Sequence, residues 1–226
     1  MGSLLCLQGG AEFQPDCRDI DLAVRERLPA AARVVVTALA GSPGRDYAKA
    51  TANGVRWWTG LGADAAGAPD ARENASEALA ILESADLVVL PGGSPSRLRT
   101  ALFDTGVGQL LRRRWAAGEC GLVGASAGAM LLCSHTVLPD QQGQPVAEGL
   151  GVLARSLVLP HWSGKSGWLA GLQRSAPQGT RLLGLPECSG LVIEGDEWTA
   201  YGPLGSELVP GDVIQPGETR DMSTAR

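Results

Sequence analysis

One serine in this sequence, Ser126, has neighbours that suit a nucleophile. It is the centre of the run Gly124-Ala-Ser-Ala-Gly128, which follows an apolar stretch at 120–123 and precedes small helix-forming residues up to Leu132. The pattern predicts a strand, a tight turn and a helix, with one hydroxyl group at the turn. Such a turn holds the nucleophile in a strained backbone conformation and therefore needs neighbours without bulk. We interpret Ser126 as the nucleophile of a hydrolase.

A serine hydroxyl needs a general base, and two histidines are available. His135 lies in or just past the helix that follows Ser126, and we expect it to point elsewhere. His161 follows an apolar run at 153–159 and lies in a loop, which suits an exposed and positioned imidazole. We expect His161 to be the base, and the competing interpretation is a hydrogen-bonded loop histidine.

Two carboxylates are candidates for the group that orients the base. Glu187 follows the apolar strand predicted at 181–185, just as His161 follows its own strand, whereas Asp140 lies in the preceding loop. Residues at strand ends are held more firmly, so Glu187 is favoured. The competing interpretations are a surface carboxylate for Glu187 and a turn residue for Asp140.

Strand and helix patterns alternate over most of the chain. Apolar runs predict strands, and apolar spacing of three to four residues predicts helices. In chain order we expect strands at 3–8, 33–39, near 62–67, 86–90, 120–123, 153–159 and 181–185, and helices at 16–28, 47–61, 71–84 with Asp70 as its cap, 96–102, 107–117 and 166–175. Residues 137–151 predict a loop or hairpin, and 190–194, 197–201 and 206–209 predict a closing antiparallel meander.

This order implies right-handed crossovers and a parallel sheet with helices on both faces. We therefore predict a single domain over residues 1–226, a three-layer α/β sandwich with a mostly parallel central sheet. Ligands bind such sheets outside the carboxyl ends of the strands. Because Gly9-Gly10, Gly92-Gly93 and Ser126 all follow predicted strands, we expect them to converge at one edge. The N–H groups at the start of the helix after Ser126 would face a developing oxyanion there.

The composition excludes several classes of protein. Hydrophobic residues make up 44% and charged residues 19%, with a net charge of −5. The one basic cluster, Arg112-Arg113-Arg114, lies in a helical pattern, so we expect no nucleic-acid partner. No apolar run approaches the ~20 residues of a membrane span, and the N-terminus lacks the pattern of a signal peptide, so we expect a cytoplasmic protein. The five cysteines show no CxxC spacing, and we expect no disulfide, metal or cofactor.

The glycines around Ser126 also fit the pattern of esterases and lipases. In that fold the order along the chain is nucleophile, acid, then a histidine near the C-terminus. Here His161 precedes Glu187. Choosing Asp140 as the acid restores the order but crowds all three groups into a short stretch. We therefore exclude the α/β-hydrolase fold.

Several segments together resemble the S51 serine peptidases. They are Gln8-Gly-Gly-Ala-Glu12, Leu90-Pro-Gly-Gly-Ser-Pro-Ser-Arg97, Gly124 to Met130, Pro160-His-Trp162 and Gly184-Leu-Pro-Glu-Cys-Ser-Gly190. That family contains peptidase E, an aspartyl dipeptidase, and cyanophycinase, on a flavodoxin-like fold related to class I glutamine amidotransferases. The resemblance covers most of the chain. It implies Ser126 as nucleophile, His161 as base and Glu187 as its partner, with the N–H groups of Gly93 and Ala127 as the oxyanion hole.

The substrate-binding positions depart from the family pattern. Cyanophycinases carry Asp-Gln where this chain has Ser94-Pro95, and an aspartate where it has Leu159. They place several arginines after the histidine, where this chain offers Lys165 as a cation. A bidentate arginine is the preferred partner of a buried carboxylate, so acidic substrates are less favoured here. The predicted substrate-binding residues are Gly92, Ser94, Leu159, Trp162 and Lys165.

We therefore expect a serine peptidase that hydrolyses short peptides, of dipeptidase or exopeptidase type, acting through an acyl-enzyme as a monomer or homodimer. Two alternatives stay open: a non-catalytic binding or regulatory module on the same scaffold, and a cyanophycinase-like isopeptide hydrolase. Glutamine amidotransferase activity needs a cysteine at the turn, where this chain has Ser126.

Overall fold

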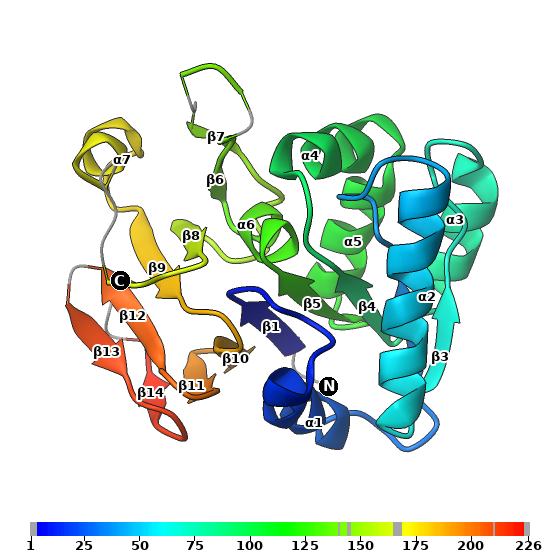
Figure 1. The fold of residues 1–226 in the computed structure, drawn as a ribbon, viewed down its shortest axis with the longest axis horizontal. Coiled ribbons are helices and arrows are strands. Elements are labelled where there is room, and N and C mark those ends of the chain that lie inside the picture. Colours follow the sequence, from blue (N-terminus) through cyan, green and yellow to red (C-terminus); the bar gives the residue numbers. More distant parts are fainter. Residues whose placement is uncertain (1–3, 140, 144–145, 165–168, 210, 224–226) are drawn as a thin grey trace.

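The structure is a computed structural model that describes residues 4–139, 141–143, 146–164, 169–209 and 211–223. Figure 1 shows a twisted central sheet with helices packed against it. Among the described residues, no helix is both long and apolar enough to cross a membrane.

The main sheet combines a parallel and an antiparallel half. Within the described residues its eight strands lie in the order β14 (Thr219–Asp221), β11 (Glu197–Tyr201), β10 (Gly190–Glu194), β1 (Leu4–Gln8), β5 (Gly121–Ala125), β4 (Leu87–Leu90), β2 (Arg33–Val36) and β3 (Asp64–Gly67). Neighbours from β1 to β3 are parallel, whereas β10 pairs antiparallel with β1 and begins the antiparallel half. The carboxyl ends of β1, β4 and β5 therefore meet at one edge.

Alternating side chains of the parallel strands enter two separate cores. In β4, Leu87 and Val89 join one hydrophobic cluster, and Val88 and Leu90 join the other. Burial on both faces explains why these strands read as continuous apolar runs. The first cluster is covered by α1 (Arg18–Glu26) and α2 (Arg45–Gly60), and the second by α3 (Ala75–Glu83), α4 (Pro95–Asp104), α5 (Val107–Ala116) and α6 (Ala127–Leu132).

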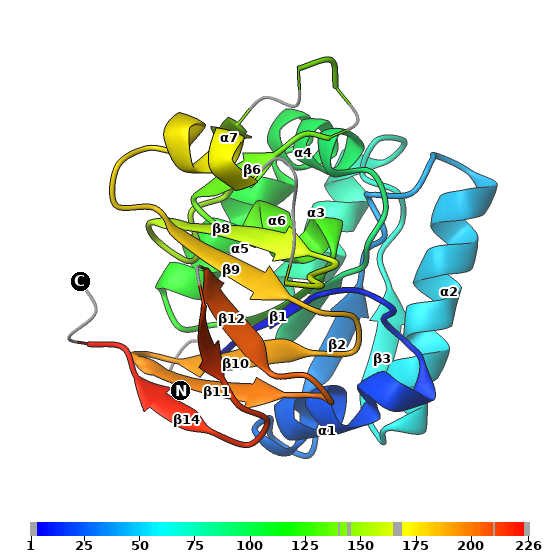
Figure 2. The ribbon, with the colours of Figure 1, turned by 60° about the vertical axis from the view of Figure 1, so that its left-hand side comes forward.

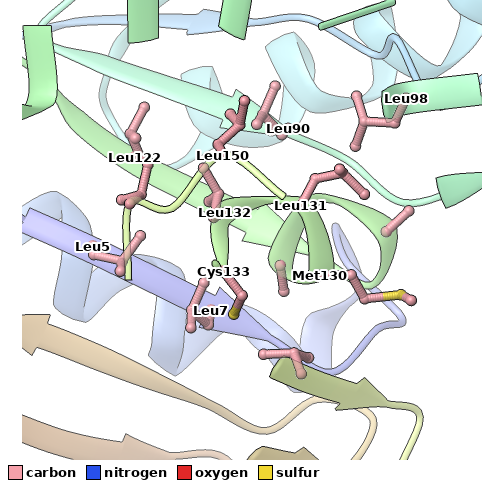
Figure 3. Packing of buried hydrophobic residues seen from close by; sticks show 14 of the residues in the cluster. Leu5, Leu7, Leu90, Leu98, Leu122, Met130, Leu131, Leu132, Cys133 and Leu150 are labelled. Atoms are coloured by element: carbon pink, nitrogen blue, oxygen red, sulfur yellow. The ribbon is translucent and has the colours of Figure 1, made fainter. Parts of the chain in front are cut away.

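A smaller second sheet lies beside the main one, and both are visible in Figure 2. Its order is β13 (Asp212–Ile214), β12 (Ser206–Val209), β9 (Arg181–Leu185) and β8 (Ser156–Pro160), with β8 and β9 parallel. Leu157 and Leu159 of β8 belong to the same core as α6. Figure 3 shows α6 in that core, with Met130 to Cys133 packed among Leu5, Leu7 and Leu122 of the main sheet.

The predicted fold class is confirmed: helices cover both faces of a largely parallel sheet, and the C-terminal strands are antiparallel. The structure refines the meander, because β10 and β11 join the main sheet while β12 pairs with β9 in the second sheet. The hairpin predicted at 137–151 is formed by β6 (His135–Val137) and β7 (Val146–Glu148). The remaining elements are the 3₁₀ helix η1 (Pro15–Cys17) and α7 (Leu169–Ser175).

One predicted helix cap is wrong. Asn74, not Asp70, caps α3, because its side-chain oxygen accepts the N–H of Glu77 at 3.2 Å. Asp70 is instead paired with Arg72, with 2.7 Å between Oδ2 and Nη2.

Candidate active site

Ser126 lies on a strained turn between β5 and α6. Its backbone has φ 49° and ψ −111°, a conformation that non-glycine residues rarely adopt. The N–H of Ser126 donates to the carbonyl of Gln8 at the end of β1, at 3.0 Å. A Cβ at residue 128 would lie 2.0 Å from the carbonyl oxygen of Leu90, so only glycine allows α6 to approach β4 this closely. The strained turn predicted from the sequence is confirmed.

His161 reaches Ser126 from the end of β8. The distance between Ser126 Oγ and His161 Nε2 is 2.7 Å, a hydrogen bond across 35 residues of sequence. The imidazole lies over the glycine loop that follows β1, where a Cβ at Gly10 would come within 2.5 Å of the ring. We expected this loop to approach a ligand, and the structure places the histidine ring there.

Glu187 follows β9, the parallel neighbour of β8, and so lies beside His161. Its Oε1 is 3.4 Å from His161 Nδ1, while the two side chains are 64% and 50% exposed. The contact is therefore longer and more open to solvent than the one to Ser126. His135 is engaged elsewhere, with its Nδ1 3.0 Å from Ser134 Oγ, and Asp140 lies outside the described residues.

The loop after β4 lies against the nucleophile. A Cβ at Gly92 would lie 3.0 Å from the Cβ of Ser126. The Gly92 N–H donates to Glu12 Oε1 at 2.7 Å, whereas the N–H groups of Gly93 and Ala127 have no acceptor among the described residues. Ala127 opens α6, and the first N–H groups of a helix have no partner within it. The loop after β4 and the start of α6 therefore each leave one N–H group without a hydrogen bond within the described part of the chain.

Glu12 was not assigned a role from the sequence, although it belongs to the Gly-Gly-Ala-Glu segment. Its neighbours Ala11 and Phe13 have φ values of 57° and 62°, so the backbone on either side is held in the left-handed region. By accepting the Gly92 N–H, the carboxylate fixes the loop that presents Gly93. A carboxylate two residues after a glycine pair at a strand end is the signal that the sequence offers.

A second carboxylate, buried beneath β1, was also missed. Gln8 Nε2 donates to Asp21 Oδ1 at 2.6 Å, and Trp57 Nε1 donates to Asp21 Oδ2 at 2.7 Å. Burial raises the pKa of Asp21 to about 6, and the two donors oppose that rise. Because the Gln8 carbonyl accepts the Ser126 N–H, this network braces the strand end beneath the nucleophile.

Two of the five predicted substrate-binding residues lie beside the candidate nucleophile. Gly92 and Ser94 lie in the loop beside Ser126, where the Ser94 side chain caps α4 by accepting the Arg97 N–H at 3.1 Å. Lys165 lies outside the described residues.

The other two predicted contacts, Leu159 and Trp162, are buried. Leu159 is 2% exposed and Trp162 is 9% exposed, and both belong to the core. The indole of Trp162 covers Gly184 and donates a hydrogen bond to Glu207. These side chains offer little surface to a substrate, so the proposed binding site does not include them.

The chain belongs to peptidase family S51, whose family model matches residues 5–200. Cyanophycinases from Trichormus variabilis and a Nostoc species are each 29% identical to it over 167 residues, which is 69% of this chain and 56% of theirs. The chain thus spans little more than half the length of these curated relatives. The family resemblance predicted from the sequence is confirmed.

Two solved structures share the fold. A peptidase from an acI-B1 actinobacterium superimposes with a TM-score of 0.78 at 23% identity, covering 98% of this chain and 97% of the other. A putative peptidase E protein from Listeria monocytogenes gives a TM-score of 0.64 at 17% identity, covering 90% of this chain and all of the other. At these identities the likeness shows the fold alone.

Proposed function

We propose that this chain is a serine peptidase that hydrolyses short peptides, with Ser126, His161 and Glu187 as its catalytic residues. The observation that carries the proposal is the 2.7 Å contact between Ser126 Oγ and His161 Nε2 at a strained strand-to-helix turn. Membership of family S51 supports the same reaction class.

The geometry supports a double-displacement mechanism. Ser126 Oγ attacks the scissile carbonyl carbon while His161 Nε2 takes its proton, and Glu187 stabilises the imidazolium through Nδ1. The N–H groups of Gly93 and Ala127 stabilise the oxyanion. His161 then protonates the leaving amine, and it later deprotonates the water that hydrolyses the acyl-enzyme.

We propose that the substrate is a short peptide, which the chain cleaves by dipeptidase or exopeptidase action. The described loop beside Ser126 presents Gly92, Gly93 and Ser94, which carry no charge to recognise an acidic side chain. This argues against strict specificity for aspartate. The likeness to cyanophycinases favours isopeptide hydrolysis as the second candidate.

A peptide panel tests the proposal. The purified chain is incubated with dipeptides, tripeptides, N-blocked peptides and aspartyl–arginine isopeptides, and the products are identified by mass spectrometry. We expect cleavage of short peptides that is lost in both Ser126→Ala and His161→Ala. Ser84→Ala is the matched control, since this exposed serine follows α3 and its hydroxyl donates to the Ile81 carbonyl at 2.9 Å, within its own helix end. Peptide binding without cleavage by the wild type would instead show a non-catalytic module.

A further inference from the structure

Two cysteines that are far apart in the sequence meet beside the candidate active site. Cys17 ends η1, and Cys188 directly follows Glu187. Their Sγ atoms are 3.0 Å apart, although 171 residues separate them in the chain. The scattered spacing of the cysteines predicted no disulfide, because spacing does not reveal which residues the fold brings together. Both thiols are free in this structure.

The two thiols differ in their access to solvent. Cys17 is 1% exposed, and its Sγ donates to the carbonyl of Ala11 at 2.9 Å. Burial raises the pKa of the Cys17 thiol. Cys188 is partly exposed, so a dissolved reagent meets Cys188 first and Cys17 second.

Both cysteines also contact the loop that lies under the histidine ring. The Cys188 N–H donates to the carbonyl of Gly10 at 3.2 Å, while Cys17 bonds to the next residue, Ala11. Cys188 has φ 51°, so its backbone is already held in a conformation that is unfavourable for a side-chain-bearing residue. A bond between the sulfurs would tie the loop that carries Glu187 to the start of α1.

We propose that Cys17 and Cys188 form a reversible modification site, closed to an intramolecular disulfide by a low-molecular-weight disulfide such as glutathione disulfide. The Cys188 thiolate attacks one sulfur of glutathione disulfide, whose S–S bond breaks and releases one glutathione. The Cys17 thiolate then attacks the Cys188 sulfur and releases the second glutathione. The protein loses two protons and two electrons, and glutathione disulfide takes up both to become two molecules of glutathione. The sulfurs need to approach by about 1 Å to reach bonding distance.

The remaining cysteines provide an internal comparison. Cys6, Cys120 and Cys133 are at most 3% exposed. Among the described residues, none of these three thiols forms a hydrogen bond to another cysteine. We therefore expect them to stay reduced when the Cys17–Cys188 bond forms.

The test is oxidation of the fully reduced protein by glutathione disulfide, followed by intact mass measurement and peptide mapping without reduction. We expect a monomer that has lost two hydrogen atoms, a cross-linked peptide pair containing Cys17 and Cys188, and reversal by a dithiol reductant. Cys17→Ser should accumulate a glutathione adduct on Cys188, and Cys188→Ser should gain neither adduct nor cross-link. Cys120→Ser, the matched control, should close the bond as the wild type does.

The stability of the oxidised protein gives a second readout that does not depend on peptidase activity. A disulfide across so long a loop restricts the unfolded chain, so the urea midpoint should rise on oxidation in the wild type and stay constant in Cys17→Ser. A stable adduct on Cys188 of the wild type or a disulfide-linked dimer, in place of the intramolecular bond, would each overturn the proposal.

Discussion

The two nitrogen atoms of the His161 ring face very different regions of the molecule. On the Nε2 side, Ser126 is 9% exposed and lies 2.7 Å away. On the Nδ1 side, Glu187 has a side chain that is 64% exposed and lies 3.4 Å away. The proposed nucleophile is thus fixed inside the protein, whereas the proposed orienting carboxylate lies at the surface, where solvent weakens an ion pair.

The elements that carry these groups explain the difference. Ser126 lies between β5 and α6, and α6 is packed between the main sheet and β8 (Figure 3). Glu187 follows β9 in the smaller second sheet, and its side chain is exposed although Pro186 before it is buried. We therefore expect the dependence of activity on each group to fall steeply from the Ser126 side to the Glu187 side.

Removing the nucleophile is the largest expected effect. Ser126→Ala should lower kcat for peptide hydrolysis by about 10⁶-fold, the order found when a triad serine is removed from an established serine peptidase. Steady-state kinetics against the preferred peptide measures this change, with Ser84→Ala as the control. A loss of less than about tenfold would place the reaction on another residue.

Gly10→Ala should break the contact between Ser126 and His161 without replacing any of the proposed catalytic residues. The added Cβ would lie 2.5 Å from the His161 ring, and the ring would have to move from Ser126. We expect kcat to fall by about 10²-fold, since a shift of about 1 Å in a catalytic group has that effect. Gly44→Ala is the matched control, because Gly44 also has positive φ (79°) but has open space around the added Cβ. Equal losses in the two variants would mean that backbone strain, not the ring, is responsible.

Glu187→Gln tests the exposed side of the comparison. We expect kcat to fall by about tenfold, far less than the ~10⁴-fold loss that follows when a buried triad carboxylate is neutralised. The difference in kcat between the wild type and Glu187→Gln should also shrink at high salt, because the contact is exposed and salt screens it. Glu197→Gln, on the exposed end of β11, is the control. A loss near 10⁴-fold would show that Glu187 is shielded in the working enzyme.

Asp21→Asn is expected to change the pH dependence of stability and to affect activity least. Burial raises the pKa of Asp21 from 3.8 to about 6 in the folded protein. The folded state therefore favours the protonated form, and this stabilisation is fully present below pH 3.8 and is lost as the pH rises through 6. The free energy of unfolding of the wild type should fall by about 3 kcal/mol over this window relative to Asp21→Asn.

Urea denaturation from pH 4 to pH 8 measures this difference, with the exposed Asp19→Asn on the same helix as the control. A difference between the wild type and Asp21→Asn that stays constant with pH would contradict the raised pKa.

The sequence was sufficient to predict those turns and strands that depend on neighbouring residues alone. The strained turn at Ser126 follows from glycines and alanines on both sides of one serine, and the buried strands follow from continuous apolar runs. The approach of the Gly92 backbone to Ser126 also matches the expectation that residues after parallel strands converge at one edge. The second sheet was not foreseen, because β12 pairs with β9 and β13 rather than with β11, the strand before it, and strand patterns do not specify such partners.

Side-chain surroundings were harder to predict than strands. The sequence places Leu159 two residues before His161. It does not reveal that β8 packs in the same core as α6, which buries this side chain. Glu12 and Asp21 were missed because their partners, Gly92 and Gln8, lie in other segments of the chain. The glycine pair before Glu12 marks that carboxylate as a candidate, but spacing does not reveal which residue it contacts.

The most direct test of the central claim is covalent labelling with a fluorophosphonate, followed by peptide mapping of the modified residue. A serine activated by a base at 2.7 Å should react with the phosphorus centre, so we predict a single adduct on Ser126 in the wild type. Labelling should be much slower in His161→Ala and absent in Ser126→Ala. An unlabelled wild type, or an adduct on Ser126 that forms equally fast without His161, would contradict the account.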